Sequence, residues 1–228
     1  MKRFRLLAFA PLFFTVPSFG YAQGILKGRV VFEGAPPAPE KVEVKSDTPT
    51  CGTQKEIHKI VLGEGQGVAN AVVTIVGAKG ELPAKDGSLD QVQCEFVPHV
   101  QAMPLGSTLK ITSSDSVLHN SHGFYEDGST AFNLAVPIVG MEAPFKTKQP
   151  GIIKLRCDAG HTWMSAYVMV TDTPYYALTD ANGNFTITGV PPGQYEIEVW
   201  QEWIGKHREP VEVKGGEQPL AITLKKPS

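Results

Sequence analysis

The sequence has little excess charge of either sign and no basic cluster. Its 21 Lys and Arg residues nearly balance its 23 Asp and Glu residues, which leaves a net charge of −2 over 228 residues. Nucleic-acid binding requires a positively charged footprint, so we expect no nucleic-acid partner. Beyond the first 22 residues no stretch is apolar enough to cross a bilayer, and we therefore expect no membrane span.

Helical periodicity is also missing. No segment of useful length repeats apolar residues every three or four positions. Instead, 23 Gly and 18 Pro residues separate short runs that are rich in β-branched side chains. These features predict an all-β chain.

The first 22 residues are typical of a secretory signal peptide. Basic residues among positions 2–5 precede an apolar run at 6–16, and small residues lead to Ala22. The apolar run is too short to span a bilayer, and no cysteine follows it for lipid attachment. We therefore expect an exported protein, periplasmic or secreted.

Cysteine is scarce, with only three in the chain. In an exported protein this number suggests one disulfide and one cysteine with another role. Cys51 and Cys94 are the favoured pair, because Cys157 lies within a pattern of metal ligands. The other pairings stay open, since a bridge forms only where the geometry permits it.

A short segment at 156–164 carries three side chains of types that bind copper in other proteins. Cys157, His161 and Met164 bring a thiolate, an imidazole and a thioether close together in the sequence. This is the ligand set of electron-transfer copper, in which a second histidine comes from elsewhere in the chain. The best candidate for that histidine is His119.

A purely structural interpretation of the same residues exists. Cys157 and Met164 would then fill a core and His161 would lie at the surface, as such residues often do when taken singly. However, the segment contains a glycine and lies between two strand-like runs at 152–155 and 166–171. A loop of this kind is a poor place for a core, which favours the metal site.

The segment 87–172 contains strands and candidate ligands in a definite order. An aromatic-Val-Pro strand at 96–98 is followed by a glycine turn and then by a strand at 108–112. His119-Asn120 comes next, and Cys, His and Met follow on the last loop after a long middle. In this order the segment resembles the cupredoxins, the family of plastocyanin and azurin. The resemblance implies a Greek-key sandwich that binds copper.

The same resemblance implies a role for each residue of the site. His119, Cys157 and His161 would be the strong copper ligands, and Met164 the weak axial one. Asn120 would hydrogen-bond the ligand loop and hold the thiolate in place.

The ligand loop departs from the family in its spacing. Cys-x3-His-x2-Met is tighter than in plastocyanin or azurin, and it is similar to the second half of the dinuclear copper loop of cytochrome oxidase subunit II. A dinuclear site needs a second cysteine four residues before Cys157, where this chain has Ile153. We therefore expect a mononuclear site.

Other histidines are weaker candidates. His122 is a further candidate ligand, but residues three apart on a strand face opposite sides, so only a turn would let it join His119. The other interpretation of His122 is an imidazole close to the site that does not bind the metal. We rate His58 and His99 lower still and expect His207 at the surface.

Trp163 lies inside the ligand loop. It would shield the metal or form a contact surface for a redox partner, and an aromatic side chain at the rim serves both purposes.

A second resemblance lies near the C-terminus. Thr-Asp-x-x-Gly-x-Phe at 179–185, followed by Pro-x-Gly-x-Tyr at 191–195, resembles the carboxypeptidase regulatory-like domain. That domain is a transthyretin-type β-sandwich with a carbohydrate-binding-like fold. Its first strands are matched by 24–30 and 69–76, on the far side of the copper segment.

These positions predict a split domain. One sandwich would comprise residues 24–86 and 173–228, and the cupredoxin unit at 87–172 would be inserted into it at a loop. The alternative is two consecutive domains, with the N-terminal strands joining the cupredoxin sheet.

The predicted function is an exported mononuclear, type 1-like copper protein that carries one electron at a time between redox partner proteins. We expect no enzyme activity, because the chain lacks the paired His-x-His motifs of a further catalytic copper site. The alternative is a carbohydrate- or protein-binding module with a secondary or degenerate copper site, since fold alone does not establish function. In that case aromatic residues would stack on sugar: Tyr175, Trp200 and Trp203.

Overall fold

Short alternating runs separated by glycine and proline form eighteen strands in residues 22–226, the part of the chain that the computed structural model describes. Within this range the only helices are α1 (Thr48–Cys51) and the 3-10 turn η1 (Glu64–Gln66). The prediction of an all-β chain is therefore confirmed. The predicted signal peptide lies outside the described residues, apart from Ala22.

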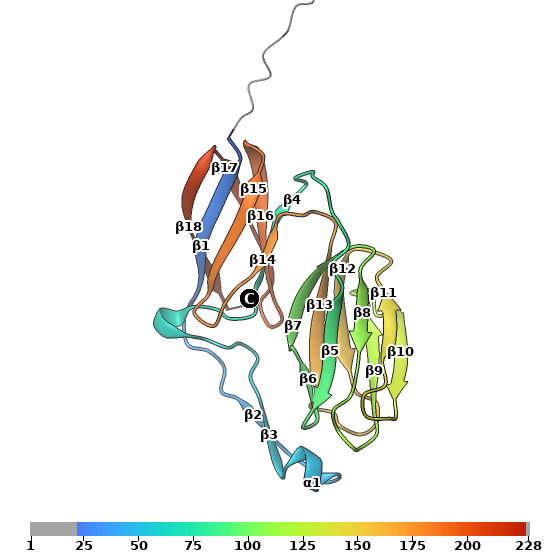
Figure 1. Cartoon of the computed structure of the whole chain (residues 1–228). Helices are drawn as coiled ribbons and strands as arrows, with labels where there is room; N and C mark the ends of the chain where they lie inside the picture. The colour runs from blue at the N-terminus through green and yellow to red at the C-terminus, as the bar shows by residue number, and fades with distance from the viewer. Residues whose placement is uncertain (1–21, 227–228) are drawn as a thin grey trace, which may run out of the picture.

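The strands build two β-sandwiches that lie side by side (Figure 1). The first sandwich has one sheet in the order β15-β1-β18 and another in the order β14-β4-β16-β17. Their bounds are β1 (Gly24–Glu33), β4 (Val72–Val76), β14 (Tyr176–Leu178), β15 (Asn184–Val190), β16 (Gly193–Gln201), β17 (Gly205–Val213) and β18 (Gly216–Lys225).

Strands from both ends of the chain form this first sandwich. β1 pairs antiparallel with β15 and, along its whole length, parallel with β18. β4 lies between β14 and β16. The side chains that alternate inward from these strands, such as Leu26, Ile75, Ile197 and Ile222, make one buried core. Strands β1 and β4 therefore pair with strands from the C-terminal part of the chain, and neither lies in a sheet of the second sandwich.

The second sandwich consists of the intervening strands. Its sheets have the orders β10-β9-β12-β13-β7 and β11-β8-β5-β6, with a separate core between them. Their bounds are β5 (Gly87–Val92), β6 (Glu95–Val97), β7 (Val100–Pro104), β8 (Thr108–Ile111), β9 (His119–Phe124), β10 (Thr130–Val136), β11 (Ala143–Lys146), β12 (Gly151–Arg156) and β13 (Ser165–Thr171).

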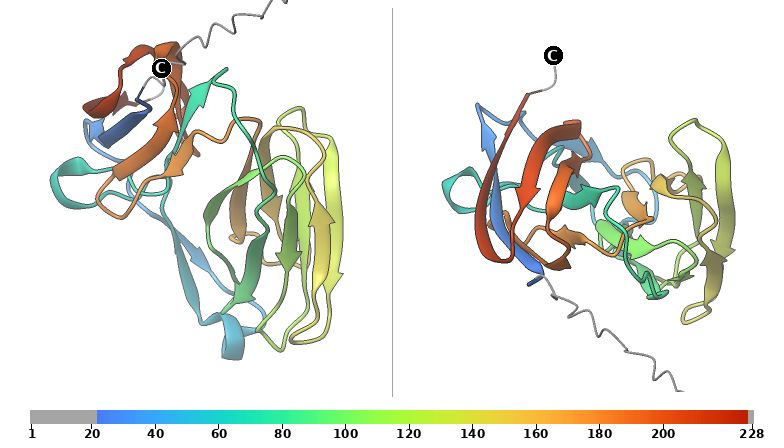
Figure 2. Two further views of the ribbon diagram at one scale, coloured as in Figure 1. Left: turned by 45° about the horizontal axis from the view of Figure 1, so that its top comes forward. Right: turned by 90° about the horizontal axis from the view of Figure 1, so that it is seen from above.

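Residues 40–57, which we call the cap, differ from the expected division of the chain. They comprise β2 (Glu40–Glu43), α1 and β3 (Gln54–Ile57), with β2 and β3 paired antiparallel. Their position in the sequence suggests the first sandwich, but Val44 and Cys51 are buried in the core of the second. Figure 2 shows the cap reaching away from β1 along one end of the second sandwich.

The two sandwiches meet at a small apolar junction. Val72 and Trp200 of the first pack against Val100, Ile152 and Met169 of the second. Around this patch, His99 contacts Glu202 at 2.7 Å and Lys206 contacts Glu126 at 2.7 Å.

The junction and the first core contain the aromatic residues considered for sugar stacking. Trp200 is only 6% exposed and lies 5.2 Å from Tyr167 between ring centroids. Trp203 packs on Phe32, and Tyr175 packs against the first core. None of the three forms an exposed platform.

One glycine of the first sandwich is predicted to be indispensable. Gly183 has φ +80° in the turn before β15, and a Cβ there would collide with the backbone of Val30 and Val68. Gly205 has the same left-handed φ, +82°, with open space around it. We expect Gly183→Ala to lower the free energy of unfolding by about 3 kcal/mol and Gly205→Ala by about 1 kcal/mol. Urea unfolding followed by circular dichroism measures both, and equal losses would contradict the packing described.

The stability that His99 contributes at the junction is predicted to depend on pH. Burial lowers the pKa of His99, but its hydrogen bond to Glu202 and the charge of that residue outweigh burial, so the pKa lies above its ordinary value. A raised folded-state pKa contributes stability that is complete below the unfolded pKa of about 6.5 and is lost as the pH rises through the folded value.

The difference in unfolding free energy between wild type and His99→Gln should therefore shrink from about pH 6 to about pH 8. Urea titrations at several pH values test this, and a constant difference would count against it.

Candidate metal centre

Two neighbouring strands place the sequence-predicted ligands at one end of the second sandwich. β9 and β12 are antiparallel, with His122 opposite Arg156. His119 begins β9 and Cys157 directly follows β12, so the two residues lie at the same end of the sheet. The ligand loop, residues 157–164, then connects β12 to β13 and carries His161.

His119, Cys157 and His161 converge. The Nδ1 atoms of His119 and His161 lie 3.9 Å and 3.8 Å from the Cys157 sulfur. All three residues are buried, with exposed fractions of 0%, 4% and 0%. Metal bonds of about 2.3 Å to sulfur and about 2.0 Å to nitrogen, spread about 120° apart, separate the donors by about 3.7 Å. The three atoms therefore fit around one metal ion with little movement.

A carboxylate holds the far nitrogen of each imidazole. The Nε2 atom of His119 lies 2.9 Å from Asp115 Oδ2, and that of His161 lies 3.0 Å from Asp47 Oδ2. A carboxylate accepts hydrogen bonds, so Nε2 carries the proton and the Nδ1 lone pair faces Cys157. Both rings are thus held in the tautomer and orientation that a metal ligand needs.

The environment of His119 favours the neutral form that binds metal. Burial lowers the pKa of His119, and the nearby His161 lowers it further, which together exceed the opposing effect of Asp115. The proton therefore leaves Nδ1 readily.

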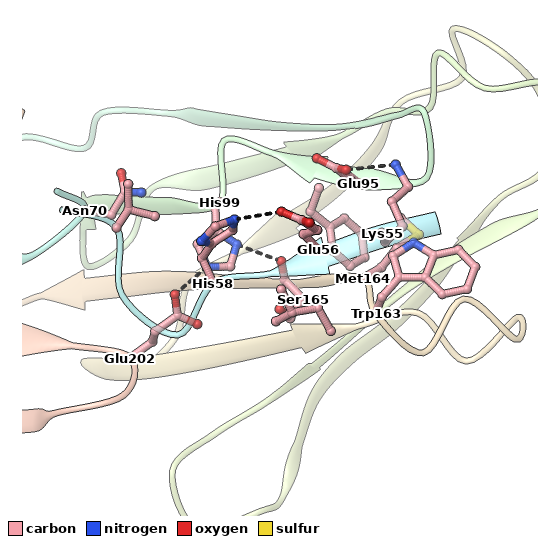
Figure 3. Close-up of a pocket in the computed structure, with 13 residues that line it drawn as sticks. Lys55, Glu56, His58, Asn70, Glu95, His99, Trp163, Met164, Ser165 and Glu202 are labelled. Carbon is pink, nitrogen blue, oxygen red and sulfur yellow. Dashed lines mark hydrogen bonds and ion pairs between the residues drawn. The ribbon is translucent and has the colours of Figure 1, made fainter. Parts of the chain in front are cut away.

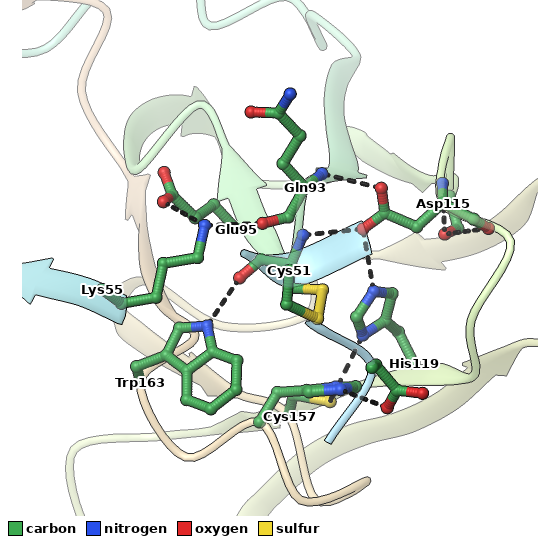
Figure 4. Close-up of a disulfide and its surroundings, with 12 residues drawn as sticks. Cys51, Lys55, Gln93, Glu95, Asp115, His119, Cys157 and Trp163 are labelled. Atoms are coloured by element: carbon green, nitrogen blue, oxygen red, sulfur yellow. Dashed lines mark hydrogen bonds and ion pairs between the residues drawn. A yellow bond between two sulfur atoms is a disulfide. The ribbon is translucent and has the colours of Figure 1, made fainter. Parts of the chain in front are cut away.

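Asp115 also holds a strained turn. Its two oxygens accept hydrogen bonds from the backbone nitrogens of Gln93 and Cys94, each at 2.7 Å. Those two residues connect β5 to β6 and have φ of +51° and +60°, which non-glycine residues adopt at a cost. One carboxylate thus fixes both His119 and the turn that carries Cys94 (Figure 4).

The ligand loop is fixed at both ends. Asn120 Oδ1 accepts a hydrogen bond from the Asp158 backbone nitrogen at 2.6 Å, and its Nδ2 donates to Asn133 at 2.8 Å. The Met164 nitrogen donates to the His161 carbonyl at 3.0 Å and closes a turn. Asn120 therefore links β9 to the residue of the ligand loop that directly follows Cys157.

Met164 and Trp163 close the remaining sides of the loop. Met164 is buried in the same core as Cys157. Trp163 packs edge-on to His161, with ring centroids 5.4 Å apart, and its Nε1 donates to the Cys94 carbonyl at 2.9 Å. Trp163 therefore shields His161 as an indole held by its own hydrogen bond.

A pocket of about 250 Å³ lies beside this loop (Figure 3). Trp163 and Met164 form part of its wall together with Lys55 and Glu95.

His122 does not reach the three ligands. Side chains of β9 alternate between buried and half-buried, so His122 points to the opposite face from His119. Its Nδ1 contacts Asp158 at 2.6 Å and its Nε2 contacts Thr130 at 3.1 Å. The strand continues without the turn that ligation would require, and His122 supports the ligand loop through Asp158 instead.

The other histidines are not among the converging ligands. His99 lies at the junction, bonded to Ser165 and Glu202. His58 is exposed beside Glu56, and His207 contacts Glu209 on β17.

The favoured disulfide is confirmed, and it lies against the metal centre. Cys51 and Cys94 are bridged with their Cα atoms 5.1 Å apart, and Cys157 is free. Each sulfur lies within 4.8 Å of a ring nitrogen of His161. The bridge joins the cap to the β5–β6 turn and so brings Asp47 to the site.

Sequence reasoning found the three converging ligands but missed their two carboxylate partners. Asp115 precedes His119 by four residues, but no motif marked its carboxylate as the partner of that imidazole. Asp47 is 114 positions from His161, and its proximity to Cys51 was the sole available signal.

Removal of the Asp115 carboxylate is predicted to destabilise the metal-free protein. Asp115→Ala leaves three hydrogen-bond donors without their acceptor and should lower the unfolding free energy by about 3 kcal/mol. The control Asp127→Ala removes an exposed turn carboxylate of the same sandwich that bonds only to Ser129, and it should have little effect. Thermal unfolding compares them, and similar midpoints would show that the network carries no stability.

Comparisons with known proteins bear on two parts of the chain. The model of the carboxypeptidase regulatory-like domain matches residues 157–225. This match begins at Cys157 and so includes the ligand loop and β13, which belong to the second sandwich, before it covers β14 to β18. No curated protein sequence matches the chain.

Solved structures that are similar to part of the chain include cupredoxins and a copper-containing nitrite reductase from Thermus scotoductus SA-01. A purple cupredoxin from Nitrosopumilus maritimus is 23% identical, covers 38% of this chain and 100% of its own, and has a TM-score of 0.33. A pseudoazurin from Sinorhizobium meliltoi is 19% identical over 39% of this chain and 76% of its own, with a TM-score of 0.32.

An amicyanin variant is 18% identical over 43% of this chain and 98% of its own, with a TM-score of 0.33. The two families that the sequence predicted both appear in these comparisons, each matched over part of the chain.

Proposed function

We propose that the protein is an exported mononuclear copper protein that carries single electrons. The observation that carries this proposal is a buried cysteine sulfur faced by the Nδ1 atoms of two histidines whose Nε2 atoms are held by carboxylates. A thiolate with two imidazoles suits an electron-transfer copper ion, which exchanges one electron as it changes between Cu(I) and Cu(II).

The protein residues keep the ligand frame the same in both oxidation states. Asp47 and Asp115 fix the ring orientations, and Asn120 fixes the loop that follows the thiolate. A frame held in this way and kept from water needs little rearrangement when an electron arrives or leaves. Met164, buried in the same core, is the proposed weak fourth ligand.

The enclosure of the site supports a carrier rather than an enzyme. A catalytic metal site keeps an open position for water or substrate. Here the three converging ligands are buried, Trp163 packs against His161, and Met164 is buried in the same core as Cys157. We therefore propose electron exchange with redox partner proteins and no substrate chemistry.

The alternative of a carbohydrate-binding module gains no support from the first sandwich. Trp200 is buried at the junction, and Tyr175 and Trp203 are half-buried against the first core, whereas sugar stacking needs an accessible aromatic face.

Copper titration tests the proposal. Cu(II) added to the metal-free protein should bind in a one-to-one ratio and give an intense visible thiolate-to-copper absorption band that ascorbate bleaches. Cys157→Ser should lose the band, because it removes the thiolate. His58→Gln, which removes an exposed histidine that is not among the three converging ligands, should retain it. A colourless wild-type complex, or a band that survives in Cys157→Ser, would refute the assignment.

A further inference from the structure

We propose that the cap makes the metal centre a closed one. Asp47 is a positioning residue for His161, and the disulfide-anchored cap excludes external ligands such as small anions. This inference rests on the proposed copper site and adds a determinant of its specificity: electrons pass through protein, and ligands from solution do not bind the metal.

The Asp47 side chain does not cap the helix that follows it and contacts His161 instead. Asp47 immediately precedes α1, where an aspartate side chain ordinarily caps the first backbone nitrogens of the helix. Here its side chain makes no capping bond, and the contact it makes is with His161 Nε2 at 3.0 Å. The turn is held by its backbone instead, since the nitrogens of Thr50 and Cys51 donate to the Asp47 carbonyl.

The backbone conformation of Asp47 also supports a role in positioning His161. Its φ is +56°, in the left-handed region that non-glycine residues enter only at a cost. Aspartate is one of the residues that accept this conformation more readily than most. The chain therefore accepts backbone strain at the residue whose carboxylate reaches His161.

A disulfide, an ion pair and a buried valine attach the cap to the second sandwich. The disulfide from Cys51 to Cys94 lies four residues after Asp47. Lys55 then crosses to the same β5–β6 turn and donates to the Gln93 carbonyl at 2.7 Å and to Glu95 at 2.8 Å. With Val44 in the core of the second sandwich, the cap is held on both sides of Asp47.

His161 is completely buried although it lies on a loop. It lies on a connecting loop, where side chains are usually exposed, yet its exposed fraction is 0%. Asp47 and the disulfide cover the ring on the cap side, and Trp163 packs on it from the ligand loop. The cap therefore supplies burial that the second sandwich alone would not provide.

Chemical labelling of the metal-free protein tests the closure without copper. Diethyl pyrocarbonate modifies accessible imidazoles, and mass spectrometry locates the label. In the wild type we expect His58 to be labelled and His161 to be protected. Asp47→Gly removes the carboxylate without a backbone penalty, and Cys51→Ser/Cys94→Ser removes the disulfide that anchors the cap. In both variants the reagent should label His161 at least about tenfold faster than in the wild type.

Two variants serve as controls for the labelling. Glu56→Ala removes a carboxylate from the same cap that pairs with Lys41 and His58 at the surface, and it should leave His161 protected. Asp47→Asn retains an oxygen acceptor for Nε2 and should restore most of the protection. Rapid labelling of His161 in the wild type, or unchanged protection in Asp47→Gly and the double variant, would overturn the inference.

Copper binding supplies the second readout. Loss of a residue that orients a metal-bound histidine typically weakens affinity by about 10- to 100-fold, and we expect this for Asp47→Gly but not for Glu56→Ala. Azide should shift the Cu(II) spectrum of Asp47→Gly and leave that of the wild type unchanged. An azide-induced shift in the wild type would contradict the closed centre.

The two readouts separate the two proposals. If the wild type gives no thiolate absorption band, the proposed function fails, and labelling still decides whether the cap covers His161. If the band is present but azide reaches the wild-type copper, the function stands and the closure fails.

Discussion

The hydrogen bonds from two imidazoles to two carboxylates are the interaction on which the rest of this structure depends. They place a proton on each Nε2 and turn each Nδ1 toward the Cys157 sulfur. Without them two buried histidines would have unpaired polar atoms and free choice of tautomer, which is costly in an apolar interior. Asp115 reaches one ring from within the second sandwich, and Asp47 reaches the other from the cap.

This arrangement gives the unusual chain order a physical purpose. Strands β1 and β4 both belong to the first sandwich, and the chain leaves that sandwich after β1 and returns to it at β4. The cap lies on that excursion and crosses to the second sandwich, where the disulfide fastens it beside His161. A segment that belongs by position to one domain thereby completes the metal centre of the other.

Much of the site could be predicted from the sequence because its ligands lie at fixed places on neighbouring strands. The donor types and spacing of Cys157 and His161 indicated the loop, and the period of two along a strand argued against His122. The cap could not be predicted in the same way. Its link to His161 spans 114 positions, and neither hydrophobic pattern nor residue spacing encodes a single hydrogen bond between distant loops.

Anomalous diffraction at the copper absorption edge, from crystals of the copper-loaded protein, tests the central claim most directly. The account predicts one peak within bonding distance of the Cys157 sulfur and of the Nδ1 atoms of His119 and His161. Asp115 and Asp47 should still contact the two Nε2 atoms. A peak bonded to either Nε2 atom, or one lying between His122 and Asp158 on the other face of β9, would contradict it.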